Sequence, residues 1–152
     1  MLEEVGARTG VSGLRLDDSG LCGLSYSDDL EVVLECPEGS PVLYLYAPLV
    51  SLPDRDAEEL FRKILKANFL GLETGGASFA IHDRYNSIML CHREVIDRME
   101  DNYALEKLLS NFIAMASQWQ KKLHQSSEID SLPSRGDFSV HWDEIAPNAI
   151  RI

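Results

Sequence analysis

Basic residues are scarce in this 152-residue chain, which has 14 Lys and Arg against 25 Asp and Glu and a formal net charge of −11. Surplus carboxylates repel a phosphate backbone, so we expect no nucleic-acid partner. The same charge favours solubility, and it would also complement a basic, partly unfolded ligand. Composition leaves these two interpretations of the charge open.

Long apolar runs and paired cysteines are also missing. No run approaches the roughly 20 apolar residues of a membrane span, and the start Met-Leu-Glu-Glu lacks the basic residues of a secretory signal. Cys22, Cys36 and Cys91 are odd in number and scattered, which favours reduced thiols. We therefore expect a cytoplasmic protein without membrane insertion. Residues 1–124 should form one domain, followed by a polar linker and an apolar tail at 125–152.

The usual motifs of catalysis and metal binding are lacking as well. Thr74-Gly-Gly-Ala77 follows a helical pattern and precedes a strand, which reverses the order of a phosphate-binding loop, and its glycines suit a sharp turn instead. His82, Cys91 and His92 are the best metal candidates, but no CxxC, HExxH or carboxylate cluster accompanies them. Nothing marks an oxyanion hole near Cys91 or Cys22. We expect no catalytic residue, no metal, no cofactor and no enzymatic activity.

The clearest periodicity lies between Ala57 and His92. Apolar residues recur every three or four positions as far as Ala67, which predicts an amphipathic helix. Asp54 or Asp56 would cap its first turn, and Gly71 suits its C-terminal end because glycine adopts positive φ at little cost. A loop and a β-hairpin should follow this helix.

Alternating apolar residues bounded by turn residues predict an antiparallel sheet. The predicted strands are residues 14–17, 21–26, 30–36, 42–49, 79–82 and 88–91. A short helix is expected at 2–9. A single apolar stripe from Leu105 to Leu123 predicts the longest helix, with its stripe in the core.

The third main strand has apolar or aromatic side chains on both faces. Leu43 and Leu45 lie on one face, and Tyr44 and Tyr46 lie on the other. A sheet with two such faces needs cover on both sides. The second face is therefore either a binding surface or a surface buried within its own domain.

Several segments, taken in order, resemble a known family. They are Leu16-Asp-Asp-Ser-Gly-Leu-Cys-Gly-Leu, Leu43-Tyr-Leu-Tyr-Ala-Pro-Leu-Val-Ser-Leu-Pro, Ile64-Leu-Lys-Ala-Asn-Phe-Leu, Thr74-Gly-Gly-Ala and Trp119-Gln-Lys-Lys-Leu. This ordered set is similar to the class I type III secretion chaperones of the Tir chaperone (CesT-like) family. The resemblance covers residues 11–124, roughly the whole predicted domain.

The resemblance implies a fold and a dimer. The fold would be α+β in the order α-β-β-β-α-β-β-α, with a twisted antiparallel sheet packed with helices, in a homodimer. The second helix and the strand after the Gly75-Gly76 structural loop would form the dimer contact, although each of these side chains could equally belong to an intramolecular core. The implied dimer residues are Leu60, Phe61, Ile64, Leu65, Asn68, Phe79 and Ile81.

The resemblance also implies a function. A cytoplasmic chaperone of this family holds the N-terminal segment of a secreted effector in an extended state, and the secretion ATPase would be a further partner. An extended segment can add to a free sheet edge while its alternate side chains fill apolar pockets. We predict such pockets among Leu14, Leu16, Leu24, Tyr26, Tyr44, Tyr46, Ile88 and Leu90.

Two other functions stay open at this point. A protein of the same fold could sequester a regulator of secretion genes, and the identity of the partner would discriminate between the two. A small-molecule enzyme is a more remote alternative, because it requires a concave site with convergent polar groups. The apolar tail could dock on its own domain, on a second copy or in a ligand groove.

Overall fold

The structure, a computed structural model, describes residues 2–26, 30–53, 55, 57–98, 101–127 and 150–151. Its helices are α1 (Leu2–Thr9), α2 (Glu58–Ala67) and α3 (Asn102–Ser127), with short 3-10 turns at Phe69–Gly71, Asp83–Tyr85 and Ile96–Arg98. Its strands are β1 (Leu21–Ser25), β2 (Glu31–Glu35), β3 (Val42–Ser51), β4 (Ser78–His82), β5 (Ser87–Val95) and β6 (Ile150–Arg151). The predicted α+β fold and its order of elements are confirmed, and β6 is an addition to them.

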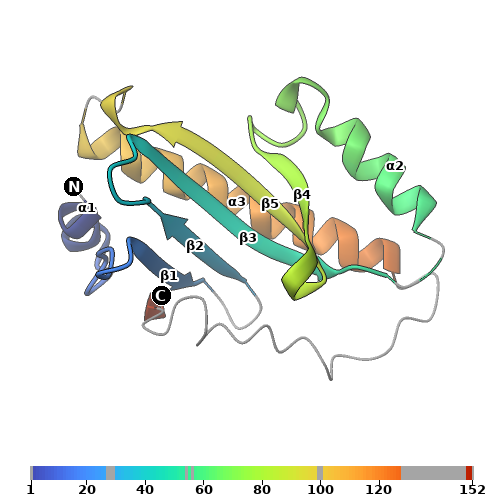
Figure 1. Cartoon of the computed structure of the whole chain (residues 1–152), viewed down its shortest axis with the longest axis horizontal. Coiled ribbons are helices and arrows are strands. Elements are labelled where there is room, and N and C mark those ends of the chain that lie inside the picture. Colours follow the sequence, from blue (N-terminus) through green and yellow to red (C-terminus); the bar gives the residue numbers. More distant parts are fainter. Residues whose placement is uncertain are drawn as a thin grey trace.

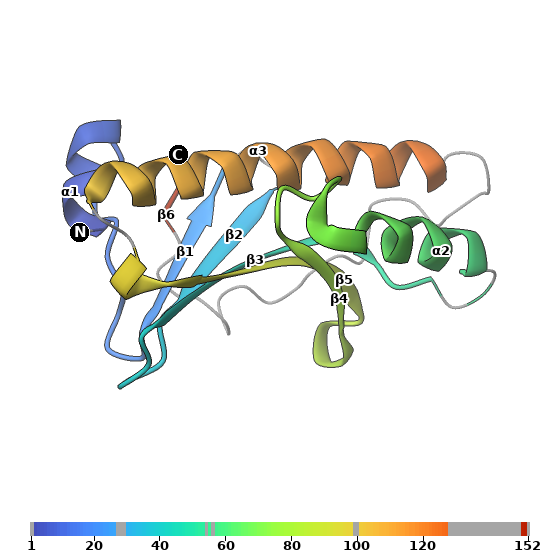
Figure 2. The same cartoon turned by 90° about the horizontal axis from the view of Figure 1, so that it is seen from above.

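The strands form one twisted sheet in the order β4-β5-β3-β2-β1-β6 (Figure 1). Strands β1 to β5 pair in antiparallel fashion, and β6 pairs with β1 in parallel. The β3–β5 ladder is the longest and contains a bulge between Pro48 and Val50. Figure 2 shows α3 lying across one face of this sheet. Helix α1 lies near the N-terminal end of α3, and α2 lies near the C-terminal end of α3.

The core lies between the sheet and α3. Alternate side chains of each strand face the helix, since successive residues of a strand point to opposite faces. The core-facing set includes Leu24 of β1, Leu34 of β2, Leu45 of β3, Leu90 of β5 and Phe79 of β4. Opposite them stand Leu105, Leu109, Phe112, Ala116, Trp119 and Leu123 of α3. The prediction that this helical stripe is core is confirmed.

Helix α1 is fixed to α3 at the other end of the molecule from α2. Arg8 forms an ion pair with Glu106 at 3.0 Å, and Val5 is buried in the core. A Cβ on Gly6 would lie 2.6 Å from the carbonyl oxygen of Val11, so only glycine permits this close approach. The predicted short first helix is thereby confirmed and explained.

Two sequence-based boundaries were wrong. Residues 14–17 do not form a strand, because turns with positive φ at Gly10 and Gly13 carry this segment across from α1 to β1. Helix α3 continues to Ser127, three residues into the predicted polar linker, since none of these residues is a glycine or a proline. The predicted caps Asp54 and Asp56 lie outside the described residues, as does most of the predicted tail.

Candidate functional site

Large apolar side chains are exposed on α2, on the loop that follows it and on β4. We call this set the α2–β4 surface: Leu65, Phe69, Leu70, Leu72 and Ile81, whose exposed fractions run from 47 % for Ile81 to 79 % for Leu72. Soluble proteins rarely leave contiguous apolar surface uncovered, and such surfaces typically mark partner contacts. The α2–β4 surface is therefore a candidate interface.

The backbone of the loop after α2 determines how this surface is presented. Leu70 has φ of 57° and Gly71 has φ of 65°, so two successive residues adopt the left-handed conformation. For leucine this costs on the order of 1–2 kcal/mol. A Cβ on Gly71 would lie 2.9 Å from the Cα of Gly76, and Gly75 and Gly76 also have positive φ. Gly75 and Gly76 therefore form the sharp turn, with the close backbone approach, that the sequence predicted.

Asn68 ties the end of α2 to the outer edge of β4. Its Nδ2 donates to the carbonyl oxygen of Phe79 at 3.2 Å, and the Phe79 amide donates to its Oδ1 at 2.7 Å. An edge strand otherwise presents unpaired amides and carbonyls to other chains. Asn68 satisfies both groups of Phe79 within the same chain.

The predicted dimer residues are placed at different depths. Leu65 and Ile81 are exposed, Leu60, Phe61 and Asn68 are half-buried, and Ile64 and Phe79 are buried in the core. The two exposed side chains are free to meet a partner. Ile64 and Phe79 support the surface from beneath, as intramolecular core.

Asn68→Leu is expected to lower the free energy of unfolding by about 1–3 kcal/mol. The substitution has similar volume, but it leaves the amide and the carbonyl of Phe79 without their partner. Urea unfolding followed by circular dichroism measures the loss. Lys66→Ala, at an exposed neighbour on α2, is the control and should change stability by no more than about 0.5 kcal/mol. Equal stability of Asn68→Leu and the parent would contradict this role.

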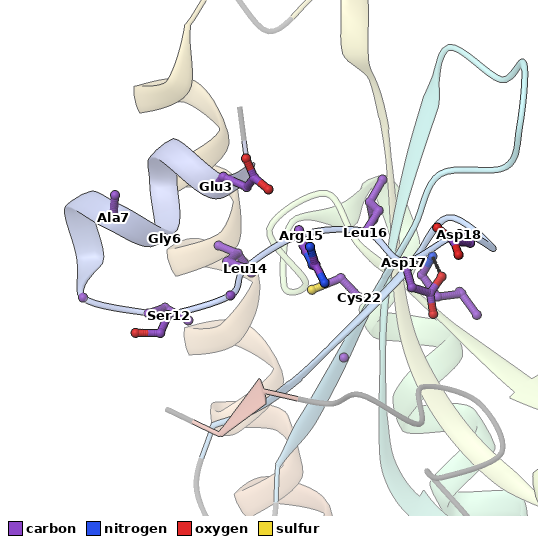
Figure 3. A pocket seen from close by; sticks show the side chains of 15 residues that line it. Glu3, Gly6, Ala7, Ser12, Leu14, Arg15, Leu16, Asp17, Asp18 and Cys22 are labelled. Carbon is purple, nitrogen blue, oxygen red and sulfur yellow. Dashed lines mark hydrogen bonds between the residues drawn. The ribbon is translucent and has the colours of Figure 1, made fainter.

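A second apolar feature is a groove at the other side of the molecule. We call it the β1 groove; it measures about 270 Å³ and lies between α1, α3 and β1. Its apolar lining includes Val5, Val11, Leu14, Leu24, Leu109 and Ile113. Tyr26, 45 % exposed, also lines it. A larger and more polar hollow of about 960 Å³ adjoins it, lined by α1, by residues 10–18 and by the start of β1 (Figure 3).

The predicted client-binding residues are likewise divided. Tyr26 and Tyr44 are exposed, Leu16 and Tyr46 are half-buried, and Leu14, Leu24, Ile88 and Leu90 are buried. Leu14 and Leu24 still line the β1 groove. Ile88 and Leu90 do not fit the prediction, because the alternation of β5 places both in the core, where a client cannot reach them.

Tyr44 and Tyr46 lie on the sheet face opposite α3. Their neighbours Leu43 and Leu45 belong to the core, and successive residues point to opposite faces. The Tyr46 hydroxyl donates to a carboxylate oxygen of Glu35 at 3.1 Å. Burial and this carboxylate together raise the pKa of Tyr46, so its hydroxyl remains a neutral donor.

The metal candidates His82, Cys91 and His92 do not converge on one site. Cys91 and His92 are successive residues of β5 and point to opposite faces, while the His82 ring lies 4.5 Å from the ring of Tyr85. Burial raises the pKa of the Cys91 thiol to about 11 and also raises that of Cys22. A neutral thiol is a poor nucleophile and a poor metal ligand.

Within the part of the chain that the structure describes, no group of three or more His, Cys, Asp or Glu residues is placed to hold a metal ion. Among the helices described, none combines the length and the apolar character needed to cross a bilayer.

Some surface residues were missed by the sequence prediction. Phe69, Leu70 and Leu72 were not among the predicted dimer residues, although they are among the most exposed large apolar side chains described. A usable signal was present, because three large apolar residues within four positions directly after a helix exceed what one helical face can bury.

Comparison with known proteins gives a family and a set of similar folds. The sequence model of the Tir chaperone protein (CesT) family matches residues 1–120. Among curated protein sequences, none matches the chain significantly.

Three solved structures contain chains of similar fold. A chain in the crystal structure of the ExsC-ExsE complex superposes with a TM-score of 0.66 and 22 % identity, covering 79 % of this chain and 88 % of that one. The structure of the HopA1-SchA chaperone-effector complex gives 0.61 and 15 %, with 80 % and 88 % covered. The heterodimeric ExoU-SpcU complex from the type III secretion system of Pseudomonas aeruginosa gives 0.60 and 21 %, with 80 % and 96 % covered.

Proposed function

Since the chain belongs to the Tir chaperone protein (CesT) family, we propose that it is a cytoplasmic type III secretion chaperone. It binds the N-terminal segment of a secreted effector in an extended state and so keeps the effector soluble and competent for secretion. The family match over residues 1–120 is the observation that carries this proposal. The similar fold in a chaperone-effector complex supports it.

The α2–β4 surface is the proposed homodimer contact. It exposes five large apolar side chains, which is more than isolated surface residues would explain. A two-fold interface uses the same patch on both copies, so each exposed side chain is buried twice in the dimer. Asn68 occupies the β4 edge at Phe79, so contact through side chains is favoured over a shared sheet at that position.

The proposed client site is the β1 groove with the neighbouring edge of β1. An extended segment can pair its main chain with a strand edge and place alternate side chains in apolar pockets. Tyr26 and Tyr44 provide exposed aromatic surface for further contacts, and the net charge of −11 attracts a basic segment. Ordering a disordered client costs on the order of 2–5 kcal/mol, so a tight complex requires a long contact.

This function requires binding and release but no chemical turnover. The two cysteines with a raised pKa, Cys22 and Cys91, carry protonated thiols at neutral pH, which suits a structural role better than a catalytic one. We therefore propose that the protein is not an enzyme.

Co-expression with the product of the neighbouring open reading frame tests the proposal. We expect the two proteins to co-purify, and the double variant Tyr26→Asp/Tyr44→Asp to lower the affinity about tenfold or more, because each change places a charge in a contact that becomes desolvated. Tyr103→Asp, which alters an exposed tyrosine of α3, is the matched control. Undiminished capture by the double variant would contradict the assigned surface, and capture of a transcriptional regulator would favour the alternative function.

A further inference from the structure

The two edges of the sheet are covered in different ways. At the β4 edge, Asn68 satisfies Phe79. At the β1 edge, Asp17 covers the start of the strand: the Leu21 amide donates to its Oδ1 at 3.0 Å, and the Asp17 amide donates to the carbonyl oxygen of Leu21 at 2.7 Å. The far end of β1 is covered by a segment from the other end of the chain.

That segment is β6, residues Ile150–Arg151. It pairs with β1 in parallel, with Leu24 opposite Ile150 and Ser25 opposite Arg151. Figure 3 shows β6 beside β1, close to the hollow lined by residues 10–18. The edge to which the proposed function assigns an incoming client strand is therefore already paired at Leu24 and Ser25.

The chain is long enough to make this contact within one copy. Helix α3 has 26 residues and so extends about 39 Å, from α1 to the far end of the sheet (Figure 2). Residues 128–149 must lead back to β1 and number 22. At up to about 3.3–3.6 Å per residue they reach about 70–80 Å, which exceeds the length of α3.

The β1 groove begins at the same residues. Leu24, which pairs with β6, also lines the groove, together with Tyr26 two positions further along the chain. Any extended segment on this edge places alternate side chains on the helix-facing side of the sheet, where the groove lies. The β1 edge and the β1 groove therefore form a single site, which can hold only one extended segment at a time.

We propose that β6 is an internal competitor: the C-terminal segment occupies the β1 edge until a client displaces it. The competition with a client rests on the proposed function, whereas the occupancy itself does not. A segment tethered to its own site acts at an effective concentration on the order of millimolar. Two paired residues make a weak contact, so the segment reduces the affinity for a client without blocking it. Weak self-occupancy also keeps a bare strand edge from pairing with other chains.

The test uses the whole 152-residue chain and a labelled peptide with the sequence of residues 145–152. Ile150→Pro/Arg151→Pro removes both backbone N–H groups of β6, including the one that faces β1, because proline has no backbone N–H. We expect the peptide to bind this variant about three to ten times more tightly than it binds the parent, whose own segment competes. Fluorescence anisotropy measures the affinity. Arg151→Ala keeps both N–H groups and should stay within about twofold of the parent.

Hydrogen exchange provides a second measurement. The amide of Ser25 should exchange faster in the proline variant than in the parent, since it faces the edge that β6 no longer protects. The amide of Leu24 points to β2, as does that of Tyr26, and should keep its exchange rate. Equal peptide affinity in the parent and the proline variant would overturn the proposal, and so would the absence of binding to either. Neither measurement uses a client. A failure to capture an effector would therefore contradict the chaperone function but not the occupancy of the β1 edge by β6.

Discussion

The double substitution Leu65→Asp/Ile81→Asp is expected to reduce the mass in solution from twice the chain mass of 17.0 kDa to 17.0 kDa. Leu65 is 66 % exposed on α2 and Ile81 is 47 % exposed on β4, so neither change disturbs the core of one chain. Full burial of such a side chain contributes about 1.5–3 kcal/mol, and a two-fold interface buries each residue twice. The dimer dissociation constant should rise on the order of a thousandfold or more.

Light scattering coupled to size exclusion at micromolar concentration measures this mass. The variant Tyr26→Asp/Tyr44→Asp is the control, because its two tyrosines lie outside the α2–β4 surface. The control variant should stay dimeric while its affinity for the client falls. The Leu65/Ile81 variant should become monomeric. A monomeric parent protein, or an unchanged mass for the Leu65/Ile81 variant, would refute the assigned interface.

Trp119→Ala is expected to cause the largest loss of stability, about 3–5 kcal/mol. The ring is 1 % exposed and meets the ring of Phe79 edge to face at 4.9 Å. Its Nε1 donates to the carbonyl oxygen of Glu73 at 3.0 Å, so one side chain of α3 supports both β4 and the loop after α2. Removing it leaves a cavity and an unpaired carbonyl.

Denaturant unfolding at neutral pH quantifies this effect. Trp119→Phe should fall between the parent and the alanine variant, because it keeps the aromatic contact but loses the hydrogen bond to Glu73. Gln118→Ala, at the exposed neighbouring position, should change stability by no more than about 0.5 kcal/mol. A loss below about 1 kcal/mol for Trp119→Ala would contradict the central position assigned to this ring.

Sequence patterns predicted the secondary structure correctly where the periodicity within one element is sufficient to define it. The period of α2 correctly predicted a helix, and the apolar stripe of α3 correctly predicted both a helix and its buried face, because a helix of 3.6 residues per turn must collect its apolar residues on one side. The strand predicted at residues 14–17 was wrong because contacts with other elements decide the structure there. Their alternation is typical of a strand, but glycine turns and contact with α1 hold them outside the sheet.

The site residues were harder to predict than the fold. Ile88 and Leu90 alternate as expected, but alternation does not reveal which face of a strand is covered. Asn68 was assigned to a partner contact, and the sequence did not reveal that its side chain satisfies Phe79 within one chain. In both cases the decisive contacts join different helices and strands, and a pattern within one element does not show them.

The sequence by itself determined the order of helices and strands, the acidic charge and the resemblance to the secretion chaperones, because periodicity, composition and short motifs are local properties. Only the tertiary structure decided which apolar residues remain exposed and which strand edges are already occupied. Exposure depends on what packs over a residue, and the occupant of the β1 edge comes from the opposite end of the chain. No local pattern near Leu24 could have indicated that its neighbour is Ile150.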